Sequence, residues 1–399
     1  MGLDIILGAD ALHAPLTGIG RYSYELASQL RQHPDVDRLR YFSHGHWVAD
    51  PLAALGGGQS PSPAVPAPGV QTTPNTAPTL FTRLRSTLSA NRAAVRVYQA
   101  LMPAISRWRV RGEGQAIFHS PNYLVPPFPG RTVNTVHDLS HVFYPEFHPQ
   151  ARVEFMNMAF GSSLRHTEHV ITDTETVRQE FIQHFGWSAD KVTAIGLGMD
   201  AAYHRRSDAE LAPVLAKHGL QPRSYALYVG TIEPRKNIGR LLQAYAQLDP
   251  ALRKACPLVL AGGKGWKSED IHRRMEQAAN EGWLHYLSYV DQADLPMLYA
   301  GARLFAYPSL YEGFGLPIVE AMASGTPVLT SDASCMPEVA GGAAALVNPL
   351  DVDDILRGLQ RHLGDEAWLR DASAKGLERA ANYSWQRCAA ETLAVYKAL

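Results

Sequence analysis

Short apolar runs of strand length alternate with helical stretches along nearly the whole chain. Leu3–Ala9 and Ala116–His119 are apolar and of strand length, whereas Gly20–Leu30 and Ala151–Leu164 fit helices. Strands that alternate with helices form parallel sheets covered by helices. The pattern therefore predicts an α/β protein. The other elements expected in the first half are strands at Arg131–His137, His169–Asp173 and Lys191–Ile195, and a helix at Glu175–Phe185.

A second alternation of strands and helices occupies the other half of the chain. It follows a polar and helical stretch at roughly Gly198–Arg223, where we place a domain junction. A last helix at about Ser384–Ala398 has enough apolar side chains to dock on a domain. The strands expected in the second half are Tyr225–Gly230, Pro257–Ala261, Leu284–Val290, Arg303–Tyr307, Val328–Ser331 and Ala343–Val347.

Composition narrows the classes of protein that fit this pattern. With 399 residues and 46% hydrophobic content, the chain is long enough for two domains, each with its own core. A formal net charge of −1 gives no reason to expect nucleic-acid binding. No secretion signal or membrane-spanning run is evident, and the three cysteines lack metal-ligand spacing. We therefore expect a cytoplasmic protein without a metal site.

One segment is strongly basic. No acidic residue lies between Asp50 and Glu113. A basic amphipathic stretch of this kind can lie on an anionic membrane surface, or it can pack its apolar side on the core. The preceding Leu55–Pro78 is rich in Gly, Pro, Ser and Thr and is expected to be a partly disordered loop. The basic stretch, 81–111, contains Arg83, Arg85, Arg92, Arg96, Arg107, Arg109 and Arg111, interleaved with Phe81, Leu84, Leu88, Val95, Tyr98, Leu101 and Trp108.

The strongest candidate site lies in the run Tyr307–Val328. A strand is followed by a glycine turn, Pro317 fits the first turn of a helix, and Gly325 fits the end of that helix. Such a turn brings backbone N–H groups to the carboxyl edge of a parallel sheet, where anions bind. Glu312 and Glu320 lie eight residues apart beside it. Their carboxylates need hydrogen-bond donors, which sugar and ribose hydroxyls would supply.

The spacing of Glu312 and Glu320 within EGFGLPIVEAMASGTPV resembles the retaining glycosyltransferase family 4 almost residue for residue. The resemblance implies a GT-B fold, in which the parallel sheets of two Rossmann-like domains face a central cleft. It further implies an acceptor domain at 1–200, a donor domain at 201–383, and a C-terminal helix at about 384–399 that crosses back to the first domain. By the same resemblance, Glu312 contacts the donor sugar and Glu320 the ribose. The turn residues expected to bind the sugar nucleotide are Gly313, Phe314, Gly315 and Leu316.

A second motif, Tyr228–Ile238, lies at the first strand-to-helix turn of the second half. It contains the adjacent cations Arg235 and Lys236. At the carboxyl edge of a sheet, a planar guanidinium and an ammonium can clamp a diphosphate. The family uses this pair to neutralise the departing nucleotide diphosphate. The resemblance therefore implies that Arg235 and Lys236 are catalytic and that no metal is needed.

Three further candidates rest on weaker patterns. Gly18 and Gly20 open a helix after the first strand and resemble the family's glycine loop near the donor phosphates. Lys264 lies in Ala261–Ser268, which is not a phosphate loop because Trp266 replaces the required glycine. The family interpretation places Lys264 near the nucleotide.

A His-Asp pair ends the strand that closes with Val136. His137 and Asp138 could orient the acceptor or contact the donor sugar, although a histidine at a strand end is also often structural. The surrounding run resembles the mannosyltransferase-type branch, which favours a catalytic His137. Asp173 or Thr174, at the end of the next strand, is interpreted as a helix cap.

The resemblance implies a retaining, metal-independent hexosyltransferase of bacterial surface polysaccharide (lipopolysaccharide O-antigen) synthesis. It would move mannose, or a GDP-deoxyhexose such as rhamnose, from a nucleotide diphosphate to a lipid-linked glycan, with no cofactor besides the sugar nucleotide. The expected partners are this donor, the acceptor, and an anionic membrane at the inner face of the cytoplasmic membrane, but no nucleic acid. A UDP-sugar donor remains the alternative, followed by a sugar-nucleotide epimerase or a non-catalytic scaffold.

Overall fold

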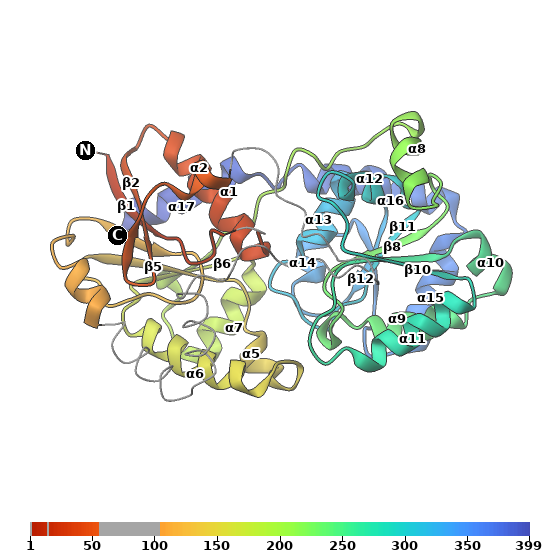
Figure 1. Cartoon of the computed structure of the whole chain (residues 1–399), viewed down its shortest axis with the longest axis horizontal. Coiled ribbons are helices and arrows are strands. Elements are labelled where there is room, and N and C mark those ends of the chain that lie inside the picture. The colour runs from red at the N-terminus through yellow and green to blue at the C-terminus, as the bar shows by residue number, and fades with distance from the viewer. Residues whose placement is uncertain (1, 14–15, 56–103) are drawn as a thin grey trace, which may run out of the picture. The chain divides into compact units, whose positions relative to one another are not determined.

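The computed structural model describes residues 2–13, 16–55 and 104–399 (Figure 1). Residues 56–78 of the expected loop lie outside the described residues. So do Arg83, Arg85, Arg92 and Arg96 of the basic stretch. Of that stretch the structure describes 104–111, in which residues 104–109 are helical.

The fold is α/β with two largely parallel sheets, as the hydrophobic pattern predicts. The first sheet has the strand order β3-β2-β1-β4-β5-β6-β7. Every strand pair with a described register in it is parallel except β2 with β3. Its strands are β1 (Leu3–Gly8), β2 (Val36–Ser43), β3 (His46–Val48), β4 (Ile117–Ser120), β5 (Arg131–Val136), β6 (His169–Thr172) and β7 (Val192–Ala194). The helical segments among them are α1 (Gly18–Gln32), α2 (Pro51–Leu55), α5 (Ser140–Phe143), η1 (Pro145–Phe147), α6 (Gln150–Leu164), α7 (Glu175–Phe185) and η2 (Ala189–Lys191).

The second sheet has the order β10-β9-β8-β11-β12-β13, and its strands are all parallel. Figure 1 shows its strands between two layers of helices, with α9, α11 and α15 in one layer and α12, α13 and α16 in the other. The strands are β8 (Ala226–Val229), β9 (Leu258–Ala261), β10 (Leu284–Ser288), β11 (Leu304–Tyr307), β12 (Val328–Ser331) and β13 (Ala344–Val347). The helices are α8 (Asp208–Lys217), η3 (Pro234–Lys236), α9 (Ile238–Ala246), α10 (Pro250–Ala255), α11 (Glu269–Asn280), α12 (Leu295–Gly301), α13 (Leu316–Ala323), α14 (Met336–Ala340), α15 (Val352–Leu363), α16 (Glu366–Ala380) and α17 (Trp385–Ala398).

The apolar strands are buried because helices cover both faces of this sheet. Every residue of β9, β11 and β12 is buried, which explains why these strands are continuous apolar runs rather than alternating ones. The covering helices are amphipathic instead: α15 buries Ile355, Leu359 and Leu363 on one face. Its first turn is capped by Asp351, which accepts from two backbone N–H groups.

The described chain divides into two compact units. The first unit comprises residues 1–134 and 162–168, and the second unit comprises 135–161 and 169–399. The domain boundaries predicted from the sequence follow the two sheets rather than these units, and they stay a prediction. Within the second unit, α17 buries Trp385 against Gly198, where an added Cβ would lie 2.4 Å from the indole.

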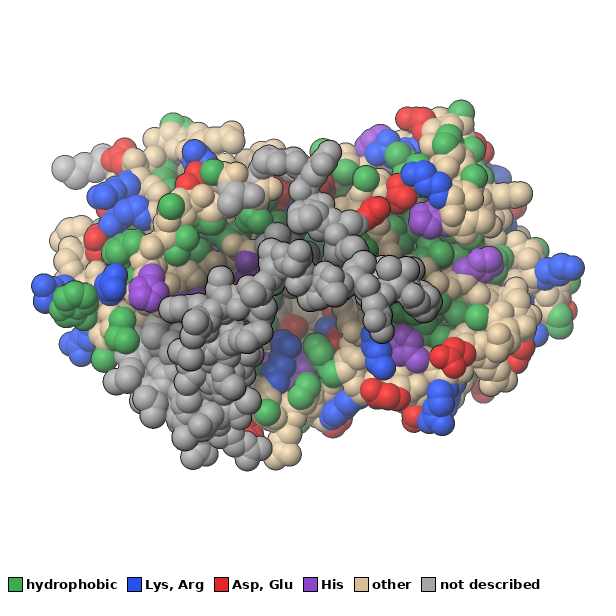
Figure 2. Space-filling view, viewed as in Figure 1, with side chains coloured by type: hydrophobic (Ala, Val, Ile, Leu, Met, Phe, Trp, Pro, Cys, Tyr) green, Lys and Arg blue, Asp and Glu red, His purple; other side chains and the backbone are tan. Residues whose placement is uncertain are grey.

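The surface is mixed in charge. On the face seen in Figure 2, acidic and basic side chains are interspersed, as a net charge of −1 suggests. Among the helices that the structure describes, none is long and apolar enough to cross a membrane.

Candidate functional site

The strand order of the second sheet brings two loops together at its carboxyl edge. From β8 the chain adds β9 and β10 on one side, and then returns to place β11 on the other side of β8. The loops that follow β8 and β11 therefore start from neighbouring strands. Such a reversal of strand order is where open α/β sheets bind their ligands. The two sequence motifs occupy these loops: Arg235 and Lys236 follow β8, and Glu312 follows β11.

Glu312 binds both cations of the other loop. Its Oε1 accepts from Nζ of Lys236 at 2.7 Å and from the hydroxyl of Tyr307 at 2.9 Å. Its Oε2 accepts from Nη1 of Arg235 at 3.0 Å. The carboxylate is buried, at 6% exposed. The three residues that the sequence predicted as catalytic in these loops therefore meet in one buried ion cluster.

The two cations keep the carboxylate of Glu312 ionised. Burial alone would raise the pKa of Glu312, but Arg235 and Lys236 lower it to about 2. Burial lowers the pKa of Lys236, and Glu312 opposes that shift. Burial raises the pKa of Glu233, whose Oε1 accepts from Nη2 of Arg235 at 3.0 Å. Glu233 and Tyr307 were missed in the sequence because neither pattern nor spacing indicates that they contact these cations.

Backbone and amide contacts join the two loops. Nη1 of Arg235 donates to the carbonyl of Tyr311 at 2.6 Å, and N of Leu310 donates to the carbonyl of Arg235 at 2.9 Å. Asn237 has φ 60°, and its amide donates to the carbonyls of Pro308 and Pro349 at 2.9 and 2.7 Å. Asparagine tolerates this left-handed conformation better than most residues. The loop that carries the two cations is thus fixed by hydrogen bonds at Arg235 and at Asn237.

The glycine turn has the form that the sequence predicts. Gly315 has φ 85° and forms the N-cap of α13, Pro317 lies in its first turn, and Gly325 follows the helix with φ 75°. An added Cβ on Gly313 would lie 1.7 Å from the carbonyl oxygen of His137. Gly313 is therefore required for close approach, and Phe314 is buried against Tyr383 at 5.3 Å between ring centroids.

Two strand ends of the first sheet contact this turn within the second unit. Nδ1 of His137, directly after β5, lies 2.8 Å from Oδ2 of Asp173, directly after β6. The hydroxyl of Thr174 donates to the carbonyl of Gly313 at 2.9 Å. Thr174 also caps α7 through Val177 N, so the expected cap at this position is Thr174 and not Asp173. His137 is thereby brought beside the turn that carries Glu312.

A polar chain leads from the cluster to the segment after α5. Burial alone would raise the pKa of Asp138, but the charge of Arg235 lowers it. Oδ1 of Asp138 accepts from the hydroxyl of Ser140 at 2.8 Å, and this hydroxyl lies 2.9 Å from Nε2 of His148. Burial lowers the pKa of His148 to about 4, so its ring is neutral at pH 7. The charge of Arg235 therefore favours the ionised form of Asp138, an effect not indicated by the place of Asp138 in the sequence.

The glycine-rich segment at 261–268 is attached to the same region. Nε1 of Trp266 donates to the carbonyl of Phe147, and Nζ of Lys267 donates to the carbonyl of Glu146, both at 2.6 Å. Lys264 is 60% exposed and lies 4.0 Å from Glu269. The structure thus does not bring Lys264 into the Glu312 cluster.

The remaining candidates make no described contact with Glu312, Arg235 or Lys236. Gly18 and Gly20 belong to the first unit, where Gly20 N donates to Thr17 Oγ1 at 3.3 Å at the start of α1. Glu320 and Leu316 lie half-buried on α13, where Glu320 adds to the effect of burial in raising the pKa of Tyr299. Within 2–13, 16–55 and 104–399, no group of three or more His, Cys, Asp or Glu is placed to hold a metal ion. Independence from metal stays a prediction.

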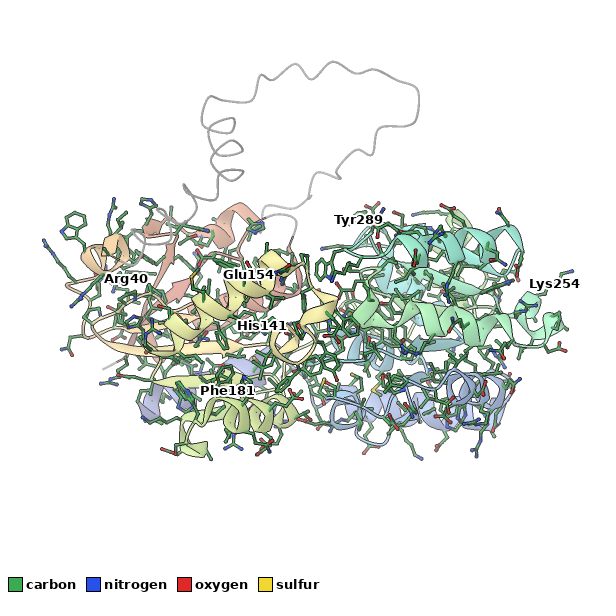
Figure 3. All side chains as sticks on the ribbon, turned by 90° about the horizontal axis from the view of Figure 1, so that it is seen from below. Arg40, His141, Glu154, Phe181, Lys254 and Tyr289 are labelled. Carbon is green, nitrogen blue, oxygen red and sulfur yellow. The ribbon has the colours of Figure 1, made fainter. Side chains whose placement is uncertain are left out.

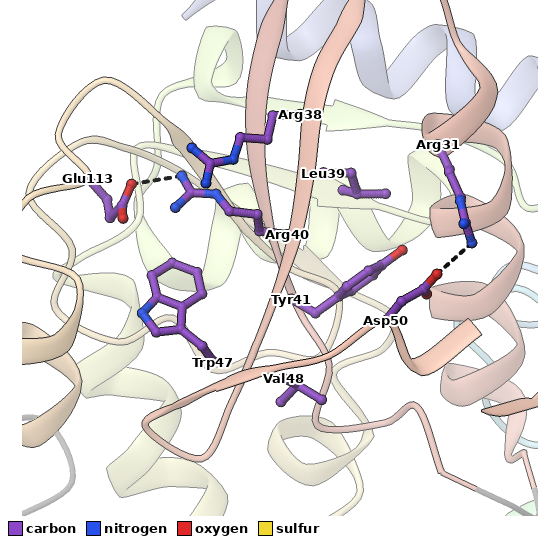
Figure 4. Close-up of a pocket in the computed structure, with 9 residues that line it drawn as sticks. All are labelled: Arg31, Arg38, Leu39, Arg40, Tyr41, Trp47, Val48, Asp50 and Glu113. Atoms are coloured by element: carbon purple, nitrogen blue, oxygen red, sulfur yellow. Dashed lines mark hydrogen bonds and ion pairs between the residues drawn. The ribbon is translucent and has the colours of Figure 1, made fainter. Parts of the chain in front are cut away.

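Two cavities occur outside this cluster. A cavity of about 550 Å³ in the first unit lies along β2 and β3 (Figure 4). Its charged side chains pair with each other, as Arg31 does with Asp50 at 2.6 Å, and Arg40 with Glu113 at 2.7 Å. A cavity of about 210 Å³ in the second unit lies between α7, α14 and the start of α17. Neither is lined by Glu312, Arg235 or Lys236.

The chain is similar to known glycosyltransferases. Residues 215–381 match the family described as "Glycosyl transferases group 1". The chain is 38% identical over 397 residues to O-antigen chain mannosyltransferase B of Escherichia coli, covering 100% of both chains. It is 33% identical over 284 residues to the serotype-specific mannosyltransferase WbdA of Escherichia coli, covering 68% of this chain and 34% of that protein. The sucrose-phosphate synthase of Thermosynechococcus elongatus shares the fold, with TM-score 0.69, 23% identity, and 99% and 98% coverage. The predicted resemblance and GT-B fold are confirmed.

Replacing Glu312 by Gln should remove an acid-sensitive contribution to folding stability. The pKa of about 2 in the folded chain lies below the ordinary 4.5, so this contribution is present above about pH 4.5 and is lost toward pH 2. At neutral pH, Glu312→Gln leaves two buried cations without their carboxylate and should cost roughly 3–5 kcal/mol. Urea unfolding at several pH values measures both effects. Glu366→Gln, which removes an exposed partner of Arg303, is the control. Parallel pH profiles for wild type and Glu312→Gln would contradict the assignment.

Proposed function

Because the chain belongs to the group 1 glycosyltransferases, we propose that it transfers mannose from GDP-mannose to a lipid-linked glycan in bacterial O-antigen synthesis. The chain is a hexosyltransferase, as the family and its mannosyltransferase relatives show. The observation that carries the proposal is the end-to-end match to an O-antigen mannosyltransferase, combined with the Glu312 cluster at the switch point of the second sheet.

The cluster is suited to a diphosphate. Nε of Arg235 is buried and has no hydrogen-bond partner among the described residues, so one strong donor is unsatisfied. A phosphate oxygen would satisfy it and would also replace Glu312 as the partner of Lys236. The carboxylate of Glu312 would then accept hydrogen bonds from hydroxyl groups of the donor sugar. Glu233 and the carbonyl of Tyr311 would keep Arg235 in place during this exchange.

The donor's other parts are assigned by the resemblance and by position. Glu320 on α13 would accept the ribose hydroxyls, and Lys264 would lie toward the base. Backbone N–H groups of Gly313 and Gly315 would face the phosphates, with Phe314 and Leu316 shaping the turn. Gly18 and Gly20 would approach the phosphates from the first unit. No cofactor besides the sugar nucleotide and no metal would be needed, because the two cations neutralise the departing diphosphate.

We infer that transfer proceeds with retention at the anomeric carbon. The bond from the anomeric carbon to the phosphate oxygen breaks, and the bond to the acceptor oxygen forms on the same face. The acceptor proton goes to the departing phosphate oxygen. Arg235 binds Oε2 of Glu312 and would keep that contact when a phosphate replaces Oε1 at Lys236, which makes this carboxylate a poor covalent nucleophile. His137 would contact a hydroxyl of the donor sugar and would not act as a nucleophile.

Calorimetric titration with GDP and with UDP tests the donor site. We expect selective GDP binding that weakens about 10-fold or more in Lys236→Ala, since a charge-assisted hydrogen bond contributes roughly 1.5–3 kcal/mol. Lys254→Ala is the control, because Lys254 lies on α10, at the far end of the second sheet's helices in Figure 3. Selective UDP binding would refute the GDP donor. Unchanged binding in Lys236→Ala would refute the diphosphate clamp.

The configuration of the product tests the mechanism. With GDP-mannose and a synthetic lipid-linked mannoside, we expect only the α-linked product, identified by NMR of its anomeric carbon and proton. Glu312→Gln should lower kcat by roughly 100-fold or more, because the carboxylate that would accept from the sugar hydroxyls and that holds Arg235 in place is lost. A β-linked product would refute retention.

The described end of the basic stretch supports peripheral binding to an anionic membrane. Trp108 is 60% exposed, and the guanidinium groups of Arg109 and Arg111 lie 5.8 and 5.4 Å from its ring centroid. Arg107 is also exposed. Trp and Arg together suit the interface between lipid headgroups and water.

Sedimentation with vesicles tests this contact. We expect binding to phosphatidylglycerol vesicles that salt weakens, with little binding to phosphatidylcholine vesicles. Arg109→Glu combined with Arg111→Glu should lower the affinity for the anionic vesicles by about 10-fold or more, at about 1 kcal/mol for each arginine removed. Arg273→Glu combined with Arg274→Glu on α11 is the control, because it makes the same change of charge at two other exposed arginines. Equal losses in both variants would show only a general charge effect and would refute the site.

A further inference from the structure

Asp173 is buried where a helix cap would be exposed. It lies between the last residue of β6 and Thr174, the N-cap of α7, and is 3% exposed. The side chain of Thr174, not that of Asp173, accepts from the first turn of α7. The carboxylate of Asp173 has one described hydrogen-bond partner, Nδ1 of His137 at 2.8 Å. Its other oxygen, Oδ1, is buried and has no hydrogen-bond partner among the residues that the structure describes.

This arrangement does not favour folding. A buried carboxylate with one unsatisfied oxygen loses hydration that a single hydrogen bond does not fully replace. Burial raises the pKa of Asp173, and the charge of His137 opposes this shift only in part. A residue that is unfavourable for stability and directed at one histidine is better explained by its effect on that histidine.

The histidine itself is fixed against the glycine turn. The carbonyl oxygen of His137 lies where a Cβ of Gly313 would be, and Thr174 Oγ1 donates to the carbonyl of Gly313. His137 and Thr174, the residue after Asp173, therefore both lie against the turn that begins at Glu312. Since an ionised carboxylate can only accept, Nδ1 of His137 carries the proton. In the neutral ring, Nε2 is then the acceptor nitrogen.

We propose that Asp173 is a positioning residue of the transfer site, which fixes the orientation and tautomer of His137 so that Nε2 accepts a hydroxyl of the bound sugar. This inference deepens the proposed function and rests on it for the identity of the sugar. Asp173 acts through His137 and does not touch the substrate. An alternative role for an acid at this position is stabilisation of the N-terminus of α7, which would not depend on His137.

A double-mutant cycle separates these two roles. We expect Asp173→Ala and His137→Gln each to lower kcat for GDP release from GDP-mannose by about 10- to 100-fold, the range for a partner that orients a functional histidine. The double variant should be no slower than His137→Gln, because the two residues act as one unit. Asp173→Asn keeps an acceptor oxygen and should recover part of the loss. The melting temperature should change by less than about 3 °C in all variants. A double variant whose loss of kcat equals the product of the two single losses would overturn the proposal. So would an unchanged kcat in Asp173→Ala.

Imidazole ¹⁵N NMR of the full chain without substrate provides a measurement that does not depend on the donor. The signals of His137 are those that disappear in His137→Gln. In wild type we expect the proton on Nδ1, and in Asp173→Ala a changed tautomer. Glu338→Gln is the control, since Glu338 accepts from Glu175 N and Thr176 N at 2.8 Å and thereby stabilises the start of α7 from α14. The control should leave the His137 signals unchanged. If the wild-type protein does not use GDP-mannose, the proposed donor is wrong. The NMR spectrum still tests the role of Asp173, because it is recorded without substrate. An unprotonated Nδ1 in wild type would overturn that role.

Discussion

The buried contact of Glu312 with Arg235 and Lys236 is the interaction on which the site depends. It crosses from the loop after β11 to the loop after β8, the two strands at which the second sheet reverses its order. Each partner alone would be an uncompensated charge in a poorly hydrated place, which costs several kcal/mol. The loops therefore keep their relative position as long as all three charges are present.

The same contact explains how the proposed diphosphate site can be stable before a ligand binds. Glu312 occupies the cations, and backbone carbonyls and Asn237 hold their loop from both ends. In the proposed function, a diphosphate would replace one carboxylate without requiring the loop to fold anew, which would limit the ordering cost of binding. Such pre-organised charge is the usual source of electrostatic catalysis.

Polar contacts spread outward from this cluster within the second unit. Asp138 faces Arg235, Ser140 bridges Asp138 to His148, and Trp266 binds the backbone beside that histidine. On the other side of the turn, Asp173 and Thr174 connect His137 and Gly313 to the start of α7. Residues far apart in the chain thus restrain one short glycine turn.

The sequence by itself determined the α/β class, most of the strands, and the roles of Pro317 and Gly325 in the turn, because period, length and backbone preference are local properties. It did not predict β2 and β3. Motifs that resemble those of the family also predicted Glu312, Arg235, Lys236 and His137 as site residues. Only the tertiary structure decided that Glu312 binds both cations, that Glu233 and Asp138 face Arg235, and that Asp173 faces His137 rather than capping α7. These contacts join loops of different strands, and no local pattern encodes which strands become neighbours. The structure also left Lys264 exposed and outside the contacts of the cluster, with its backbone bridged to Ile232.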